Sequence, residues 1–424
     1  MILDTVFNLY RSRQNLSLDS SSLERLEVKK LRRILYFAYE NVSFYHEKLK
    51  GAGFRPEDFR KLEDIRKIPF TTKKEIQNVP LRDMVARGVD INECVRNRTS
   101  GSTGISLTTL AGKKTDDYDT TMWLRSYFLN GMRLRDKMIV IKDLSAHPEP
   151  SKSWVEHLGI MKRRYVSVFE NPKKMAMFFA SEKPEIIQSY PSSLLITADL
   201  FEDLLVAKPR LVFTYAELLD SRSRESISKT FEASLFDYYG SSEIGLMSWE
   251  CKKHSNYHIN ADNIIMEFIG NDEEPLAPGE EGEIVCTNLY NYEMPLIRYR
   301  QEDIGAAVAE KCTCGVKLPL MRIAGGRKDD FLQSTDGRMI PPTIFYPFPF
   351  ENFEKISQFR VIQESRTKLR IQLVVKQSIE NSILEKAREN IRRVFGEHME
   401  VEFEMSHDLA RDPSGKLRKI ISKI

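Results

Sequence analysis

Apolar residues recur at helical spacing through the first 80 residues of the chain. Leu26 and Ile34 belong to this pattern, which is that of helices with one buried face. Farther along, Thr71 or Thr72 precedes Glu75 at the spacing of a capping box, in which each side chain accepts a hydrogen bond from the other residue's backbone. The N-terminal region is therefore predicted to be helical, with one helix starting just after this threonine pair.

Between about residue 95 and residue 245, short apolar runs alternate with helical patterns. Continuous apolar runs are typical of strands that are buried on both faces, as in parallel sheets. The runs are 138–142, 185–190, 210–215 and 235–239. Their alternation with helical segments predicts an α/β fold.

The pattern changes after residue 255, where strand-like runs are separated by proline and glycine turns. The runs 264–269 and 282–289 predict a β-rich subdomain. Beyond residue 330, strand patterns on both sides of a helical pattern near 380–395 predict a small α+β unit. We therefore predict a large N-terminal domain over 1–328, with α/β layers plus a β-rich subdomain, and a small α+β C-terminal domain over 329–424.

Composition and charge narrow the classes of function. The 424 residues include 64 basic and 61 acidic side chains, so the net charge is only +3, and 41% of the residues are hydrophobic. This balance argues against a nucleic-acid partner and a membrane partner. No apolar run approaches the roughly 20 residues that span a bilayer, and the start lacks a signal-peptide pattern. We expect a cytoplasmic protein. A homodimer is compatible with the sequence, which carries no signal of oligomeric state.

A segment rich in glycine and hydroxyl side chains, from Arg98 to Gly104, is the first candidate for chemistry. Small consecutive residues let several backbone N–H groups point at one anion, which favours a phosphate-binding loop. Ile105 and Ser106 follow, so the segment is not a Walker loop, which would continue with lysine. Taken alone, a Ser/Gly surface turn explains it almost as well.

Two further segments follow predicted strands. Tyr238 to Gly245 comes after the run 235–239, and an aromatic ring there can stack on a base while Glu243 offers oxygen to Mg²⁺. Asp303 lies in a charged segment, where a carboxylate can accept both hydroxyls of a ribose. Considered alone, the first segment is equally well explained as a strand end with a surface glutamate, and for Asp303 a solvated carboxylate is the simpler interpretation.

The last two segments lie at the predicted domain border and near the C-terminus. Residues 325–330 have the sequence Gly-Gly-Arg-Lys-Asp-Asp, and residues 412–418 have the sequence Asp-Pro-Ser-Gly-Lys-Leu-Arg. Proline and glycine favour a tight turn that presents Lys416 as a positive charge. Without context, a hairpin tip with a solvated lysine is the simpler interpretation.

Together, in this order and spacing, the five segments resemble the adenylate-forming superfamily, which includes acyl-CoA ligases and luciferases. Within it the chain is similar to the phenylacetate–CoA ligase branch, including its capsule-biosynthesis-associated relatives. The stretches that carry this closer resemblance are 38–45, 68–73, 189–192 and 213–217. The resemblance implies an AMP-forming acid–thiol ligase that activates a small carboxylic acid with ATP and Mg²⁺ and transfers the acyl group to coenzyme A.

The resemblance also implies an ATP site at the matching positions. The glycine-rich segment would surround the β- and γ-phosphates, and Asp303 would hold the ribose hydroxyls. Residues 215–218, which include Glu217, would line the adenine, with Tyr239 stacking on it. The implied nucleotide-binding residues are Ser100, Gly101, Ser102, Thr103, Gly104, Tyr215, Ala216, Glu217, Tyr239, Gly240, Ser241, Asp303 and Arg327.

Three more residues are implied to act on the reacting groups. Lys416 would bridge the attacking carboxylate and the α-phosphate, Ser242 would touch one of these groups, and Glu243 would bind Mg²⁺. Asp329 would be the hinge of a mobile C-terminal lid. Since attack of a carboxylate on a phosphate brings anions together, cations are needed at this point.

Two departures from the family patterns are visible. Many superfamily members have Pro-Lys after the glycine loop, whereas Ile105-Ser106 stands here, which is a trait of the branch and implies weaker pyrophosphate binding. The stretch 333–342 differs from the branch near the thiol channel, and this departure bears on the acyl acceptor. Transfer of the acyl group to an amine or hydroxyl therefore stays open, as does an adenylyltransferase that acts on a small molecule without coenzyme A. A non-catalytic nucleotide-binding relative is disfavoured because Glu243, Asp303 and Lys416 are all present.

Finally, cysteines and histidines occur in two short sets that suggest a metal site. Cys251 precedes His254 at a Cys-x-x-His spacing, and Cys312 and Cys314 follow some sixty residues on, with His258 as a substitute for His254. Two ligand pairs from separate loops are a common way to build a structural Zn²⁺ site. Reduced thiols beside an unrelated histidine are the alternative.

Overall fold

The computed structural model describes residues 2–98, 107–144, 156, 158–201, 208–327, 331–340, 345, 355–412 and 415–424. The chain forms two compact units, each made of two separate stretches: Met1–Gly131 with Tyr238–Ala324, and Met132–Asp237 with Gly325–Ile424. This division groups 132–237 with the C-terminal residues. The predicted domain border between residues 328 and 329 lies outside the described residues and stays a prediction.

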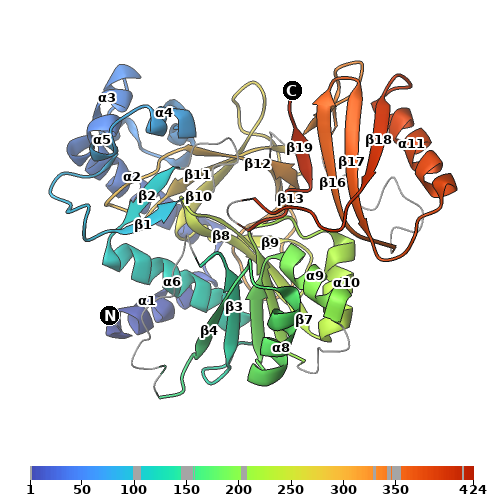
Figure 1. Ribbon diagram of the computed structural model, residues 1–424. Coiled ribbons are helices and arrows are strands. Elements are labelled where there is room, and N and C mark those ends of the chain that lie inside the picture. Colours follow the sequence, from blue (N-terminus) through green and yellow to red (C-terminus); the bar gives the residue numbers. More distant parts are fainter. Residues whose placement is uncertain are drawn as a thin grey trace. The chain divides into compact units, whose positions relative to one another are not determined.

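Helices form the N-terminal part of the first unit, as predicted (Figure 1). Among them, α4 begins just after Thr72, whose side chain accepts the Glu75 N–H, while the Glu75 carboxylate accepts the Thr72 N–H. The capping box is thus confirmed. The α-helices among the described residues of this unit are α1 (Ile2–Asn15), α2 (Ser20–Asn41), α3 (Ser43–Gly51), α4 (Lys73–Gln77), α5 (Leu81–Met84) and α6 (Lys113–Leu129).

A largely antiparallel set of strands forms the rest of the first unit, in the order β10-β11-β12-β13-β9-β8-β7. The strands are β7 (Ser234–Ser241), β8 (Gly245–Glu250), β9 (Tyr257–Ile259), β10 (Ile264–Ile269), β11 (Gly282–Asn288), β12 (Tyr299–Val308) and β13 (Leu320–Arg327). A separate hairpin pairs β1 (Val95–Arg98) with β2 (Thr108–Ala111). The predicted β-rich subdomain is confirmed by β10 and β11.

The second unit contains a parallel sheet in the order β6-β5-β3-β4. Helices α8 and α9 lie between its strands in the chain, and α10 follows β6. Its elements are β3 (Met138–Lys142), β4 (Arg163–Ser167), α8 (Pro172–Glu182), β5 (Ile186–Ser189), α9 (Pro191–Phe201), β6 (Leu211–Tyr215) and α10 (Ser221–Phe231). Strand residues such as Ile139, Ile187 and Val212 form one core with helix residues such as Phe179 and Leu194. Apolar burial on the helix-facing side holds this α/β layer together.

The C-terminal residues add a four-stranded sheet to the second unit, in the order β18-β17-β16-β19, with α11 packed against it (Figure 1). Its elements are β16 (Ile356–Ser365), β17 (Lys368–Val375), α11 (Asn381–Phe395), β18 (Glu400–Met405) and β19 (Ile420–Ser422), preceded by the short pair β14 (Leu332–Gln333) and β15 (Met339–Ile340). The predicted α+β character is confirmed. Strand β19, which the sequence pattern did not indicate, pairs with β16 in parallel.

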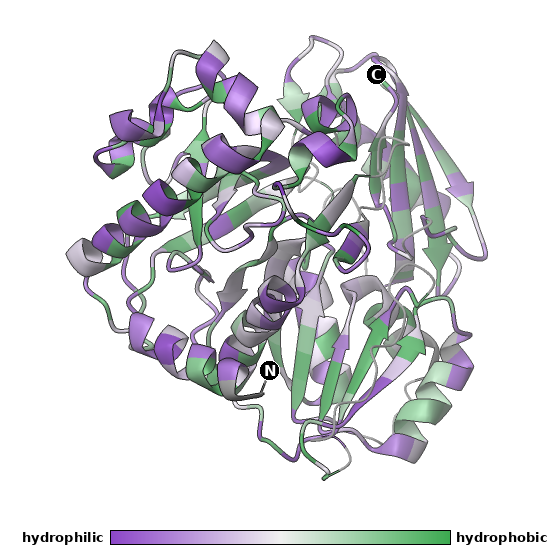
Figure 2. Ribbon diagram, turned by 90° about the vertical axis from the view of Figure 1, so that its left-hand side faces the viewer, coloured by the Kyte–Doolittle hydropathy of each residue, from purple (hydrophilic) through white to green (hydrophobic). Residues whose placement is uncertain are grey.

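Hydropathy follows this architecture, with hydrophobic residues concentrated on the strands and hydrophilic residues spread along the helices (Figure 2). Within the part of the chain that the structure describes, no helix combines the length and apolar character that a membrane span requires.

Candidate active site

Tyr239 and Asp303 come together in the first unit. Tyr239 lies near the end of β7 and Asp303 lies in the middle of β12, and the Tyr239 hydroxyl donates a 2.7 Å hydrogen bond to Asp303 Oδ2. Both side chains are half-buried. A hydrogen bond to a charged carboxylate fixes its orientation, so the residue predicted to stack on adenine also orients the carboxylate predicted to hold the ribose.

Ser242 and Glu243 lie in the turn that joins β7 to β8. The Thr109 hydroxyl donates to the Ser242 carbonyl at 3.2 Å, and the Tyr299 hydroxyl donates to Glu243 Oε1 at 3.1 Å. Tyr299 is the first residue of β12, the strand that also carries Asp303. The Glu243 carboxylate is half-buried and offers the hard oxygen ligands that Mg²⁺ prefers.

Gly240 and Ser241 end β7 where it approaches β8 closely. A Cβ at Gly240 would lie 2.6 Å from the Gly245 carbonyl oxygen, so no side chain fits there. The Ser241 hydroxyl accepts a 3.2 Å hydrogen bond from the Ile244 N–H. These contacts shape the tight turn that carries Glu243.

Asp119, on α6, contacts the end of the same turn at Gly245 and Leu246. No sequence motif indicated this residue. Its Oδ1 accepts the Leu246 N–H at 3.2 Å and the Tyr290 hydroxyl at 3.0 Å, and Tyr290 Oη also lies 3.1 Å from the Ile244 carbonyl oxygen. Gly245 has φ +88°, and a Cβ there would lie 2.2 Å from Asp119 Oδ1. Burial raises the pKa of Asp119 to about 6, and the hydrogen bonds from Leu246 and Tyr290 oppose this rise.

Tyr215, Ala216 and Glu217 lie together in the second unit, at the end of β6. The Tyr215 hydroxyl donates to the Ile141 carbonyl at 3.2 Å. Ala216 has φ +69°, a left-handed conformation that is uncommon for a residue other than glycine. Glu217 accepts two 2.9 Å hydrogen bonds from Ser192, one from its N–H and one from its hydroxyl.

The turn that carries Lys416 is closed by hydrogen bonds between Asp412 and Lys416. The Asp412 N–H donates to the Lys416 carbonyl at 2.9 Å, and the Lys416 N–H donates to Asp412 Oδ1 at 3.0 Å. The next N–H, that of Leu417, donates to Glu217 Oε1 at 2.9 Å. Two segments that lie about 200 positions apart in the chain, around Glu217 and around Lys416, therefore meet in one unit.

The remaining predicted nucleotide-binding positions are not covered by the described structure. The phosphate loop Ser100 to Gly104 and the hinge residue Asp329 lie outside the described residues. Arg327 ends β13, but its side chain also lies outside the description. Their roles stay predictions.

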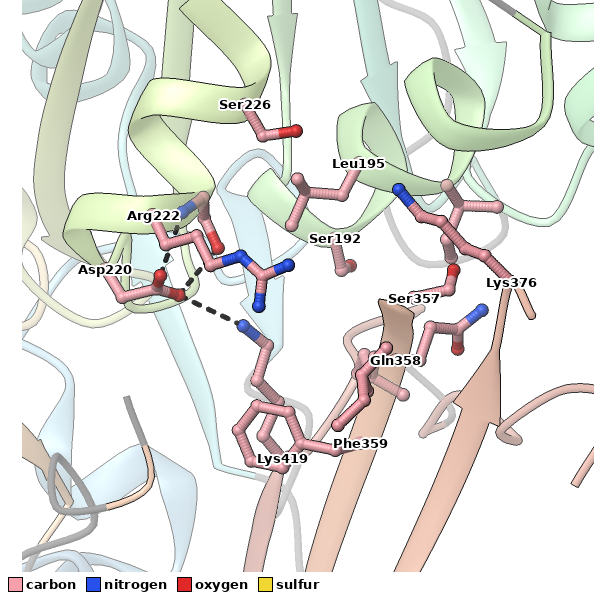
Figure 3. A pocket seen from close by; sticks show the side chains of 14 residues that line it. Ser192, Leu195, Asp220, Arg222, Ser226, Ser357, Gln358, Phe359, Lys376 and Lys419 are labelled. Atoms are coloured by element: carbon pink, nitrogen blue, oxygen red, sulfur yellow. Dashed lines mark hydrogen bonds and ion pairs between the residues drawn. The ribbon is translucent and has the colours of Figure 1, made fainter. Parts of the chain in front are cut away.

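A pocket opens in the second unit beside the Lys416 turn (Figure 3). It lies between the N-terminal ends of α9 and α10 and strand β16, and its lining includes the basic residues Arg222, Lys376 and Lys419. Asp220, which caps α10 by accepting the Ser223 N–H, also accepts a 3.3 Å hydrogen bond from Lys419 Nζ. The Asp220–Lys419 contact is a second link between the C-terminal segment and the α/β layer.

Four side chains with soft ligand atoms converge in the first unit: Cys251, His258, Cys312 and Cys314, whose ligand atoms all lie within 4.8 Å of one another. The Cys251 and Cys312 sulfurs are 3.5 Å apart, and the Cys314 sulfur is 3.3 Å from His258 Nε2. From the sequence, His254 was the preferred ligand and His258 its substitute. The structure brings in His258, whereas His254 Nδ1 lies 3.7 Å from Glu250.

The surroundings of His258 suit a metal ligand. Its Nδ1 lies 3.4 Å from the Leu318 carbonyl oxygen, so the ring is oriented with Nε2 toward the cysteines, and it stacks on Trp249. Burial lowers the pKa of His258 to about 4, which keeps the imidazole neutral at pH 7. Burial also raises the pKa of the Cys251 thiol to about 12, because it disfavours the charged thiolate. A bound dication would stabilise the thiolate and so reverse this effect.

Comparisons with known proteins extend these observations. Residues 332–423 match the family model described as the CapK C-terminal domain. A phenylacetate–coenzyme A ligase of Thermus thermophilus is 30% identical, and the match covers 74% of this chain and 73% of that protein. Protein CapK of Staphylococcus aureus is 24% identical, and the match covers 96% of this chain and 90% of that protein.

Among solved structures, 2-hydroxyisobutyryl-CoA ligase in the postadenylation state, bound to R3-HIB-AMP, resembles this chain with a TM-score of 0.80. The identity is 18%, and the match covers 97% of this chain and 92% of that one. At this identity the likeness establishes the shared fold.

Proposed function

Because this chain belongs to the phenylacetate–coenzyme A ligase family, we propose that it activates a carboxylic acid with ATP to an acyl-AMP and then transfers the acyl group to coenzyme A. The observation that carries the proposal is the arrangement in the first unit. There Asp303 is oriented by Tyr239, and Glu243 is oriented by Tyr299, which starts the strand that carries Asp303. A ribose-binding carboxylate and a magnesium-binding carboxylate are what a nucleotide site of this kind requires.

In the first half-reaction, a carboxylate oxygen of the acid attacks the α-phosphorus of ATP, and pyrophosphate leaves. Both reactants are anions, so their approach is repulsive until it is neutralised. Glu243 would hold Mg²⁺, which when bound neutralises phosphate charge, and Lys416 would supply the cation for the carboxylate and the α-phosphate. Asp303 and Tyr239 would fix the nucleoside so that the α-phosphate is correctly placed.

In the second half-reaction, the thiol of coenzyme A attacks the acyl carbon, and AMP leaves. Lys416 has no part in this step, and a lysine carried on a mobile segment can withdraw once the adenylate has formed. The Lys416→Ala variant should therefore lose adenylation and keep thioester formation from supplied acyl-AMP.

The proposal is tested by ATP–pyrophosphate exchange over a panel of carboxylic acids that includes phenylacetate. Exchange that depends on one class of acid, followed by AMP release that requires coenzyme A, is the expected result. If no acid supports exchange, the chain does not adenylate acids.

The acceptor is tested in the same assay. Residues 332–423 match the CapK C-terminal domain, and the protein CapK is similar over nearly the whole chain, which makes the acceptor the first point to check. AMP release that is independent of coenzyme A but requires an added amine or alcohol would identify the enzyme as an acid–amine or acid–alcohol ligase.

For the cysteine and histidine cluster we propose a structural Zn²⁺ site. Three thiolate sulfurs and one neutral imidazole form a donor set that zinc binds in tetrahedral geometry, and bonds of 2.3 Å to sulfur correspond to sulfur–sulfur distances of about 3.8 Å. The spacing of the four ligand atoms is close to this requirement. With four protein ligands, the ion would have no open position for substrate. It would tie the turn after β8 to the turn before β13.

A further inference from the structure

Both carboxylate oxygens of Glu217 accept hydrogen bonds. Oε2 accepts the Ser192 N–H at 2.9 Å, and Oε1 accepts both the Ser192 hydroxyl at 2.9 Å and the Leu417 N–H at 2.9 Å. Ser192 is buried in the first turn of α9, so its donors to Glu217 are carried by a helix of the α/β layer. The third donor belongs to the residue directly after Lys416.

Arg411 continues this chain of hydrogen bonds on the other side of Ser192. Its Nη1 donates to the Ser192 hydroxyl at 3.1 Å and to the Gly415 carbonyl at 2.6 Å. Because Arg411 is a pure donor, the Ser192 hydroxyl accepts from Arg411 and donates to Glu217, so all the hydrogen-bond directions agree. The Lys416 turn is thus held at Gly415 and at Leu417, one residue on each side of the lysine.

Residues near both partners of the Glu217–Leu417 contact, Gly415 and Ala216, have left-handed backbone conformations. Gly415 has φ +79°, and a Cβ there would lie 2.1 Å from Val168 Cγ1, so the turn can seat itself only without a side chain at this position. Ala216, which directly precedes Glu217, has φ +69°. A left-handed conformation costs about 1–2 kcal/mol for an L-residue other than glycine, and such strain persists where the surroundings impose it.

From these contacts we infer that Glu217 is a positioning residue, which holds the Lys416 turn in place for the adenylation half-reaction. The inference rests on the proposed function for the identity of that half-reaction. Glu217 sets the backbone from which Lys416 projects, and Arg411 and Ser192 complete the contact. This role differs from the adenine contact that the family resemblance implies for Glu217.

The physical consequence is a bias between two states of the C-terminal segment. Hydrogen bonds to a charged carboxylate are stronger than those between neutral groups, and they are lost when the turn withdraws. Glu217 therefore favours the state in which Lys416 is in place. The second half-reaction needs no such contact.

The test uses Glu217→Gln in the full-length protein, because glutamine keeps the shape but its amide nitrogen cannot accept the Ser192 or Leu417 N–H. We expect the rate of adenylation at saturating ATP to fall about tenfold, with the KM for ATP unchanged and with thioester formation from supplied acyl-AMP unchanged. Glu185→Gln is the matched control. Glu185 also accepts a backbone N–H, from Lys137 at 2.8 Å, but it lies away from the turn, so both half-reactions should be unaffected.

A raised KM for ATP with an unchanged maximal rate would overturn the inference and restore the adenine contact, while leaving the proposed function intact. Ser192→Ala, which removes only the hydroxyl, should give the same pattern with a smaller loss. If it does not, the chain of contacts does not position Lys416.

Hydrogen exchange of the substrate-free protein supplies a readout that is independent of activity. Peptides that contain Lys416 and Leu417 should exchange faster in Glu217→Gln than in the wild type or in Glu185→Gln. Unchanged exchange there would refute the positioning role, even if the acid panel had identified a different reaction.

Discussion

The Tyr239 hydroxyl donates a 2.7 Å hydrogen bond to Asp303 Oδ2, joining two residues that lie 64 positions apart in the chain. One carries the aromatic ring expected to stack on adenine, and the other carries the carboxylate expected to hold the ribose. Their contact makes the two roles interdependent, because a change at the ring's hydroxyl alters the carboxylate that binds the sugar.

The first prediction separates these roles. Tyr239→Phe keeps the ring and removes the donor, so we expect the KM for ATP in pyrophosphate exchange to rise about tenfold, the usual effect of losing a hydrogen bond to a charged group. Asp303→Ala should raise it further. If Tyr239→Phe leaves the KM for ATP unchanged, the hydrogen bond does not orient a ribose ligand.

The second prediction concerns the zinc site. Purified wild-type protein should contain one Zn²⁺ per chain by elemental analysis, and Cys312→Ser should lose most of it. His258→Gln should also lose it, because the imidazole is a ligand. His254→Gln is the matched control and should keep the metal, since His254 lies outside the cluster.

Equal zinc contents in the wild type and Cys312→Ser would remove the proposed site. Loss of zinc in His254→Gln alone would reassign the histidine ligand. Since Cys312 is less buried than His258, its variant separates metal loss from general unfolding.

The third prediction uses the pKa of Asp119, which burial raises from its usual 3.8 to about 6. A raised pKa means that the folded state binds this proton more tightly than the unfolded state. The contribution of Asp119 to the free energy of unfolding should therefore decrease as the pH rises from about 4 to about 6, and it should then stay constant.

Asp119→Asn removes that titration. Relative to the wild type, it should gain up to about 3 kcal/mol in free energy of unfolding between pH 4 and pH 7, as two pKa units correspond to nearly that amount. Urea unfolding across this range measures the difference. A difference between the two proteins that does not vary with pH would show that Asp119 titrates normally in the folded state.

The elements that the sequence predicted well are those fixed by local pattern. The run 138–142 coincides with β3, because a strand buried on both faces reads as a continuous apolar run. The Thr72 cap could be predicted because its partner Glu75 is only three residues away in the sequence. Strand β19 escaped prediction because three residues in a parallel pair carry almost no periodicity.

Contacts between distant segments could not be predicted in this way. Cys-x-x-His spacing favoured His254, yet His254 occupies a turn with φ +50°, while β9 pairs with β13 at His258 and Leu320 and so places His258 beside the later cysteines. Glu217 was predicted through the family resemblance, but its partner Leu417 lies 200 positions away. Residue chemistry is local in the sequence, whereas the partner of a side chain is set by the sheet register and by close packing.

The fourth prediction concerns Gly415, which approaches Val168 so closely that no side chain fits. Gly415→Ala should slow adenylation more than tenfold, because it adds both the left-handed backbone cost of about 1–2 kcal/mol and a steric clash to the seated turn. Gly337→Ala is the matched control in the same unit. Its φ is +88°, but a Cβ there would have only Arg366 Nη2 nearby, at 3.6 Å.

The control should show a modest loss of thermal stability and normal adenylation. The double variant Val168→Ala with Gly415→Ala should recover part of the adenylation rate, since it removes the Cγ atoms that the new Cβ would meet while the backbone cost remains. Thioester formation from supplied acyl-AMP should be similar in the wild type, in Gly415→Ala and in the double variant. If Gly415→Ala adenylates as fast as Gly337→Ala, the seating of the turn against Val168 does not control the position of Lys416.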